Sequence, residues 1–195
     1  MALYRDHGIV LRTYKLGEAD RIVSFVTEHH GKVRAVAKGV RKTRSKFGAR
    51  LEPTSHVALQ LYEGRELDIV TQAESVDHFR PIQDDLDRLG RAATMLETVD
   101  QLALEREPNP ALYRMLLGAL RTLAADDGPL VVAGFHWKLL ALEGFRPVVE
   151  TCALCEEDVD LVAFDPVEGG LLCSRHRRGS RISAEAVELM RQILG

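Results

Sequence analysis

Three cysteines and one histidine form the most specific chemical pattern in the chain. A Cys-x2-Cys pair is followed, 17 residues later, by a Cys-x2-His pair. Each pair can bind a metal ion from one tight turn, and the spacing leaves room for a β-hairpin over residues 161–172. Three thiolates and one imidazole complete a tetrahedral zinc shell with no open position, which is typical of structural sites. We therefore predict one structural zinc ion per chain, bound by Cys152, Cys155, Cys173 and His176.

Two other uses of these cysteines stay open, a redox Cys-x-x-Cys pair and buried cysteines without a ligand. A redox pair lies at the start of a helix after a strand and needs no second pair. A zinc deaminase is excluded, because it requires His-x-Glu ahead of Pro-Cys-x-x-Cys, and here Thr151 precedes Cys152. The chain also contains no phosphate-binding P-loop and no Gly-x-Ser-x-Gly motif, so we expect a protein without enzymatic activity.

A basic segment near the N-terminus could bind a polyanion. Residues 1–50 contain 12 basic and 4 acidic residues, a balance of +8, whereas the whole chain has a net charge of −3. Lysine and arginine displace counterions from a phosphate backbone, and interleaved glycines let the backbone approach it closely. A solvated loop, or a loop held by the acidic remainder of the chain, is the alternative. The predicted contacts to a phosphate backbone are Lys32, Arg34, Lys38, Arg41, Lys42, Arg44, Lys46 and Arg50.

Two further features bear on nucleic-acid binding: one aromatic residue in the basic segment, and the charge of the finger. Phe47 could stack on a base, but a role as the hydrophobic anchor of the loop is the simpler interpretation. Residues 150–168 contain seven acidic and no basic residues, so this part of the finger should repel phosphate and be architectural. An auxiliary nucleic-acid contact stays open through the arginines that follow, Arg175, Arg177, Arg178 and Arg181.

The elements that position these residues change character along the chain. Five strands are predicted: two from apolar-rich runs at 8–13 and 21–27, and three from alternating apolar residues at 32–37, 56–62 and 67–76. Their number and spacing suggest a small barrel or sandwich. From residue 81 the apolar spacing becomes helical and predicts three helices, and Ser183 can cap a fourth. We therefore expect domains at 1–78 and 79–195, with the finger at about 150–178 of the second.

The composition excludes several classes of protein. A hydrophobic content of 46% and a charged content of 28% are unlike those of disordered, collagen-like or coiled-coil chains. The longest apolar run has about six residues, whereas a bilayer-spanning helix needs about 20, so no membrane association is expected. No secretory hydrophobic region is visible at the N-terminus. We expect a cytoplasmic protein, where disulfides are disfavoured.

Four short runs in the N-terminal region act together as a specific motif. They are Gly-Ile-Val-Leu at 8–11, Leu-Gly-Glu-Ala-Asp-Arg-Ile at 16–22, Ala-Val-Ala-Lys-Gly-Val-Arg at 35–41 and Leu-Glu-Pro at 51–53. With the paired cysteines, they resemble the bacterial DNA repair protein RecO family over essentially the whole chain. Many members of that family have cysteine where this chain has His176, and imidazole serves zinc equally well.

The resemblance implies an α+β protein, with an N-terminal OB-fold barrel followed by an all-helical domain that contains an inserted zinc-ribbon-like finger. It also implies a nucleoid-associated recombination mediator that binds single- and double-stranded DNA and anneals complementary strands. Such a mediator works with RecR and helps load RecA onto strands coated by single-strand-binding protein. The alternative is a zinc-stabilised RNA-binding or transcription-associated adaptor, since OB barrels and zinc ribbons also serve RNA.

A mediator must also find strands that are already coated. The tail of single-strand-binding proteins is acidic and ends in an apolar residue with a free carboxylate, so its receptor needs an apolar groove with a cation at the rim. The end of an apolar helix could supply this partner-tail groove, although a core role for its aromatic residues is the simpler interpretation. The candidate residues are Arg121, Trp137, Leu140, Phe145 and Arg146.

Overall fold

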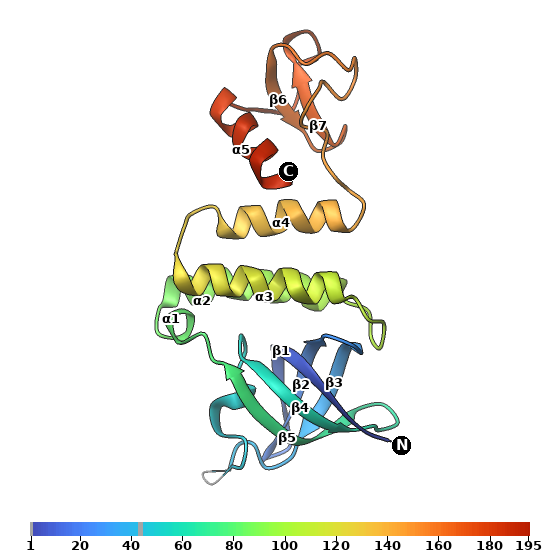
Figure 1. The fold of residues 1–195 in the computed structure, drawn as a ribbon, viewed down its shortest axis with the longest axis vertical. Helices are drawn as coiled ribbons and strands as arrows, with labels where there is room; N and C mark the ends of the chain where they lie inside the picture. Colours follow the sequence, from blue (N-terminus) through green and yellow to red (C-terminus); the bar gives the residue numbers. More distant parts are fainter. Residues whose placement is uncertain (1, 43–44) are drawn as a thin grey trace. The chain divides into compact units, whose positions relative to one another are not determined.

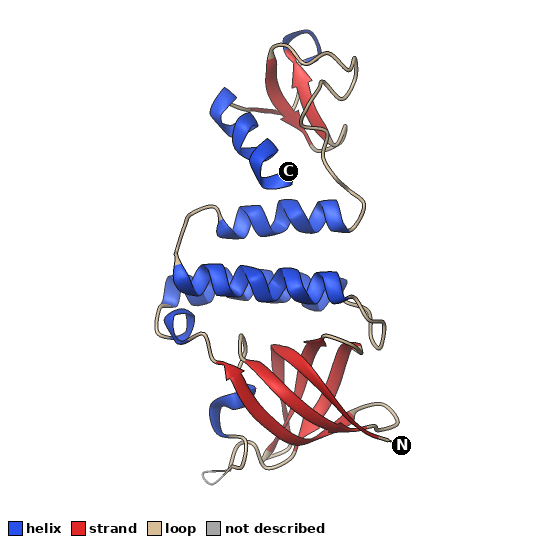
Figure 2. Ribbon diagram, viewed as in Figure 1, coloured by secondary structure: helices blue, strands red, loops and turns tan. Residues whose placement is uncertain are grey.

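The five N-terminal strands close into a small barrel. The computed structural model describes residues 2–42 and 45–195. Around the barrel the strands follow the order β1-β2-β3-β5-β4 (Figures 1 and 2). β3 and β5 are parallel and the other neighbours are antiparallel, which gives an OB-like barrel and confirms the predicted fold. The strands are β1 (Leu3–Leu16), β2 (Asp20–Thr27), β3 (Gly31–Ala37), β4 (His56–Tyr62) and β5 (Asp68–Asp77).

The barrel interior is filled by the alternate side chains of its strands. Because successive side chains point to opposite faces of a strand, residues such as Val10, Phe25 and Leu61 meet inside the barrel. A bulge between Val10 and Arg12 bends the long strand β1, which pairs with both β2 and β4. Phe47, just before the 3₁₀ helix η1 (Gly48–Leu51), is buried in the same core, which confirms its predicted role as an anchor.

Three helices follow the barrel: α1 (Arg80–Gln83), α2 (Leu86–Leu102) and α3 (Pro110–Ala125). The Asp85 side chain accepts hydrogen bonds from the backbone N–H groups of Asp87 and Arg88, so it caps the start of α2. Asn109 caps α3 in the same way, and Pro110 occupies the first turn of that helix, where its missing N–H costs nothing.

The barrel and α1–α3 form one compact unit, residues 1–132, and residues 133–195 form a second. In the first unit, the buried Asp100 carboxylate of α2 accepts a hydrogen bond from Ser24 Oγ at 2.9 Å and lies 3.0 Å from Lys32 Nζ. The connection between α2 and α3 runs beside β3: Lys32 N donates to Leu104 O at 3.1 Å, and Arg106 N donates to Lys32 O at 3.0 Å. The border between the two compact units, at residues 132 and 133, thus comes later in the chain than the predicted domain boundary at residue 78. The predicted boundary had been placed where the strands give way to helices.

The second unit combines two helices with a small sheet. It contains most of α4 (Val131–Leu142), then β6 (Leu161–Asp165), β7 (Gly170–Cys173), β8 (Ser180–Arg181) and α5 (Ala184–Leu194). The predicted hairpin and last helix are confirmed, with Ser183 capping α5, while β8 was not predicted. Its core joins Val149, Leu171 and Met190 to a partly buried Trp137. No helix in the described residues is both long and apolar enough to cross a lipid bilayer.

Removing the Asp100 carboxylate should destabilise the first unit strongly. The side chains of Asp100 and Lys32 are only 8% and 16% exposed, so Asp100→Ala leaves a largely buried ammonium group with a backbone carbonyl as partner but without the carboxylate that neutralises its charge. We expect the free energy of unfolding to fall by about 3 kcal/mol, measured by urea unfolding of the full chain. Glu97→Ala is the matched control, because the Glu97–Arg12 pair is exposed and should contribute less than about 1 kcal/mol. Equal losses in the two variants would contradict this role of Asp100.

Candidate metal centre and nucleic-acid interface

The four predicted metal ligands converge in the second unit. Cys152 and Cys155 lie in the turns ahead of β6, Cys173 ends β7, and His176 ends the 3₁₀ helix η2 (Ser174–His176). Their ligand atoms all lie within 4.8 Å of one another. The sulfur atoms of Cys155 and Cys173 are 3.8 Å apart, and His176 Nδ1 lies 3.4 Å from Cys173 Sγ and 3.7 Å from Cys152 Sγ.

These separations fit a tetrahedral metal ion. Bonds of about 2.3 Å to sulfur and about 2.0 Å to nitrogen, at tetrahedral angles, place ligand atoms about 3.5–3.8 Å apart. The observed distances of 3.4, 3.7 and 3.8 Å are close to this requirement. The cluster can therefore hold one metal ion with all four positions filled by protein, and the predicted ligand set is brought together as a whole.

The protein also prepares Cys152 for ionisation. Burial of the Cys152 thiol opposes the loss of its proton, but backbone N–H groups of both knuckles and the His176 ring lower its pKa to about 5. For Cys173, burial likewise opposes ionisation, and the backbone N–H groups of His176 and Arg175 hold the thiol pKa below its ordinary value. Thiolates are the form of cysteine that binds metal, so these hydrogen bonds favour the ligand state.

The described cations of the basic loop between β3 and η1 are exposed, and the loop is joined to the turn between β1 and β2. Arg41 makes this connection: its backbone N–H donates to Ala19 O at 3.0 Å, and its guanidinium donates to Glu18 O at 3.0 Å. Lys38 and Lys42 are exposed in the same loop. Four of the predicted DNA contacts thus belong to one loop, of which Arg44 lies outside the described residues.

Two further cations, Lys46 at the end of this loop and Arg50 in η1, help to hold its shape. Lys46 Nζ donates to Thr71 O at 2.9 Å and lies 4.9 Å from the centre of the Phe47 ring. The Arg50 guanidinium donates to Lys46 O at 2.9 Å and to Phe47 O at 3.2 Å. Carbonyl partners leave the positive charge of both side chains uncompensated, so each can still attract phosphate.

Two predicted DNA contacts on β3 are instead neutralised by carboxylates. Lys32 pairs with Asp100, and Arg34 Nε lies 2.6 Å from Glu105 Oε1. Both acidic residues come from α2 and the connection that follows it. At these two strand positions the basic side chains are therefore paired with acidic residues from the helical part of the first unit. Nothing in the local sequence around them distinguishes them from the other cations, because their partners lie about 70 residues away.

The four arginines of the possible auxiliary DNA contact divide into two kinds. Arg175 pairs with Glu157, and Arg178 pairs with Glu168 and with Asp165, the latter at 3.0 Å. The remaining two, Arg177 and Arg181, are exposed. The acidic residues of the finger thus compensate half of the possible auxiliary DNA contact.

The residues of the predicted partner-tail groove lie in different environments. The Trp137 ring packs edge-on against Phe164, with ring centres 5.3 Å apart, in the core of the second unit. By contrast, Phe145 is 74% exposed, and the adjacent Arg146 donates to Gly195 O at 2.8 Å. Leu140 is also exposed in the second unit, whereas Arg121 is exposed on α3 of the first.

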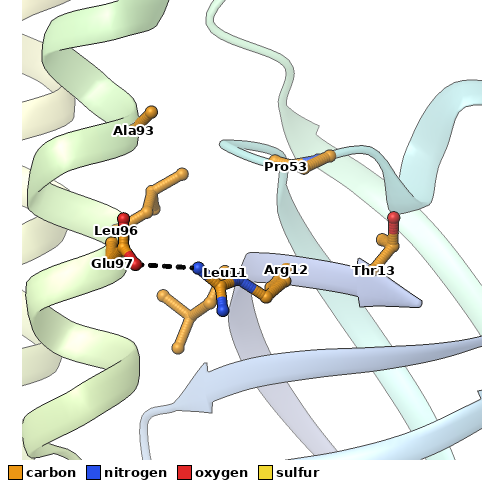
Figure 3. A pocket seen from close by; sticks show the side chains of 7 residues that line it. All are labelled: Leu11, Arg12, Thr13, Pro53, Ala93, Leu96 and Glu97. Atoms are coloured by element: carbon orange, nitrogen blue, oxygen red, sulfur yellow. Dashed lines mark hydrogen bonds and ion pairs between the residues drawn. The ribbon is translucent and has the colours of Figure 1, made fainter.

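A pocket of about 250 Å³ lies between β1 and α2 (Figure 3). Its polar feature is the ion pair between Arg12 and Glu97, at 3.1 Å, and the rest of its lining is largely apolar. Arg12 and Glu97 neutralise each other, so neither presents an unpaired charge to a ligand in the pocket. The pair instead cross-links the barrel to α2. The lining residues are Leu11, Arg12, Thr13, Pro53, Ala93, Leu96 and Glu97.

One group of potential ligands was not identified from the sequence. Ligand atoms of Asp6, Glu28 and His29 lie within 4.8 Å of one another. Asp6 and His29 are 23 residues apart, without the short repeated spacing that marks the cysteine pairs. A prediction of the exact register between β1 and β2 could have brought them together.

Comparison with protein families covers nearly the whole sequence. The model described as "Recombination protein O N terminal" matches residues 1–79, which contain the barrel. The model described as "Recombination protein O C terminal" matches residues 83–195, which contain α2 and all later elements, including the cysteine cluster. The resemblance inferred from the sequence is therefore confirmed.

Loss of one ligand should remove the metal ion and loosen only the second unit. We expect Cys155→Ser and His176→Ala to lose the ion from this site and to unfold residues 133–195 at lower temperature, because three ligands no longer close the shell. Elemental analysis of protein purified without chelator and thermal unfolding measure the two effects.

The matched control for these variants is Arg175→Ala. Arg175 Nη2 lies 3.9 Å from Cys155 Sγ without being a ligand, so this variant should keep the metal ion. Full metal content at this site in Cys155→Ser and His176→Ala would contradict the assignment of the ligands.

Proposed function

The chain belongs to the recombination protein O (RecO) family, and on this premise we propose that it is a DNA-binding recombination mediator without enzymatic activity. The family acts in DNA repair and recombination. In this proposal the protein anneals complementary strands and helps load RecA onto single strands coated by single-strand-binding protein. The observation that carries the proposal is an OB-like barrel with an exposed basic loop at one end.

The proposed DNA-binding surface is this basic loop together with the turn between β1 and β2. Strand-connecting loops, including the one between the first two strands, contribute to oligonucleotide binding in OB folds. Arg41 holds the turn and the basic loop together, and Lys38 and Lys42 are exposed beside it. Residues 29–51 contain no aspartate or glutamate, so the segment itself offers no carboxylate to repel phosphate.

The carboxylate pairs narrow the set of proposed DNA contacts. Lys32 and Arg34 are omitted, because Asp100 and Glu105 already neutralise them. Arg177 and Arg181 remain as an auxiliary contact from the second unit. The main set is Lys38, Arg41, Lys42, Arg44, Lys46 and Arg50.

We further propose that the metal ion is zinc and that its role is structural. Three thiolates with one imidazole are a zinc ligand set, and four protein ligands leave no position for a substrate or an activated water. The ion would link the turns before β6 to the end of β7 and so stabilise the finger. This role requires no catalytic chemistry, in keeping with a mediator.

The proposed partners are single- and double-stranded DNA, RecR and the tail of single-strand-binding protein. For the tail, the structure favours the exposed surface around Phe145 over a groove that includes the packed Trp137 ring. Phe145 offers an apolar contact to the last side chain of the tail. Arg146, which follows it, offers a cation to the terminal carboxylate.

Single-stranded DNA binding should depend strongly on salt. With four to six phosphate contacts, the logarithm of the affinity should fall against the logarithm of the salt concentration with a slope of roughly −3 to −4. Lys38→Ala and Lys42→Ala should each make the slope less steep by about 0.7, because each removes one phosphate contact. Fluorescence anisotropy with labelled oligomers over a salt series measures the slope.

Lys138→Ala is the matched control for these variants, since Lys138 is an exposed cation of the second unit. If the slope is unchanged in both Lys38→Ala and Lys42→Ala, these side chains make no phosphate contacts and the loop is a solvated surface feature. The proposal as a whole is tested by annealing of complementary strands coated with single-strand-binding protein, which the wild-type protein should accelerate. Tight binding of RNA oligomers without such annealing would favour the RNA-binding alternative.

A peptide with the tail sequence should bind the full chain with micromolar affinity and more weakly at high salt. Arg146→Ala should weaken binding by about tenfold, because it removes a charge-assisted hydrogen bond to the terminal carboxylate. Phe145→Ala should weaken it as well, since Phe145 is 74% exposed and its loss leaves the core intact. Calorimetric titration measures both effects. Peptide affinity unchanged by both substitutions would place the tail elsewhere.

A further inference from the structure

Two carboxylates and three histidines meet where β1 passes the turn between β2 and β3. The ladder between β1 and β2 includes the pair Gly8–Thr27, and just beyond it Glu28 N donates to His7 O at 3.0 Å. This backbone hydrogen bond fixes the two segments side by side. We call this group the β1-turn cluster; it consists of Asp6, His7, Glu28, His29 and His30.

The buried Asp6 carboxylate forms the floor of the cluster. Its side chain is fully buried, and each of its oxygens accepts two hydrogen bonds. Oδ1 lies 2.9 Å from His29 Nδ1 and 2.8 Å from His7 N, while Oδ2 lies 2.6 Å from His30 Nδ1 and 3.1 Å from His29 N. These contacts hold the carboxylate in one orientation and turn two imidazole rings toward it.

A second carboxylate lies close to the first. Ligand atoms of Asp6, Glu28 and His29 are all within 4.8 Å of one another, and His7 Nδ1 lies 3.9 Å from Glu28 Oε2. Two carboxylates at this separation repel each other, and a cation between them removes the repulsion. The side chains of Glu28 and His29 are 34% and 66% exposed, so an ion has access from solvent.

We propose that the β1-turn cluster is a second metal site, which binds a transition-metal dication such as Zn²⁺ through Asp6, Glu28 and His29. His7 stands beside Glu28 as a further nitrogen donor, and His30 is a positioning residue that holds the Asp6 carboxylate by its other oxygen. Mixed imidazole and carboxylate ligands suit zinc, nickel or copper, whereas magnesium and calcium prefer oxygen alone.

The two metal sites differ in chemistry and in strength. The cysteine cluster has four ligands and soft thiolates, so its ion should stay bound through purification. The β1-turn cluster offers nitrogen and oxygen atoms on a partly exposed surface, and the ion must displace the hydrogen bond between His29 and Asp6. Its ion should therefore exchange and should be seen by titration.

The test is a calorimetric titration of ZnCl₂ into the full chain that already carries its first zinc ion. Wild-type protein should bind one further equivalent. His29→Ala and Glu28→Gln should weaken this second binding by at least about tenfold while keeping the first ion, and His30→Ala should weaken it by about 10–100-fold. His78→Ala and Glu18→Gln are matched controls from outside the cluster and should bind as wild type.

Cobalt distinguishes the two sites by absorption. The second equivalent of Co²⁺ should bind without the sulfur-to-metal charge-transfer band that marks the cysteine cluster, and it should bind in Cys155→Ser as well. Wild-type protein that takes up no second equivalent overturns the proposal. So does a second equivalent that binds His29→Ala and Glu28→Gln as tightly as wild type, provided that circular dichroism shows both variants folded.

Discussion

The ion pair between Asp100 and Lys32 fixes the arrangement of the first unit. β3 and β5 pair in parallel near Ala35 and Val36, so the earlier part of β3 needs other partners for its backbone groups. The connection after α2 supplies them at Lys32, and Asp100 closes the contact through Lys32 and Ser24. Acidic residues of the helical hairpin thereby neutralise cations on the outer face of β3, a face that OB folds often use for nucleic acid. The proposed DNA surface therefore lies on the loops.

Patterns within one element predicted most of the fold. Three of the five strands followed from alternation and two from apolar-rich runs between turn residues, and the start of α5 followed from its cap, Ser183, because these signals act over a few residues. The break between α1 and α2 was not predicted, since the apolar spacing continues through it. The two-residue strand β8 is too short to show alternation. The division at residues 132 and 133 depends on contacts between distant segments, which no local pattern contains.

The difference between local patterns and contacts of distant segments also explains which site residues could be predicted from the sequence. The metal ligands were predicted as a complete set because each pair lies in one turn, and Cys152 and Cys155 need only a hairpin to meet Cys173. For the cations, charge alone does not show which ones are already paired: Lys32 has a buried partner, whereas Lys42 is exposed. The β1-turn cluster was missed because it depends on the register of two strands, where a shift of one residue turns a side chain to the opposite face.

The division into two contiguous units has a consequence for biosynthesis. Every residue of the first unit precedes residue 133, so the barrel and α1–α3 can complete their packing while the ribosome is still translating the finger. The cysteine pairs emerge later, and the four ligands of the proposed zinc ion are complete only when His176 has left the exit tunnel. With the proposed structural role of zinc, a cell starved of metal would still produce a folded barrel with its basic loop, attached to an immature second unit that quality-control proteases can recognise.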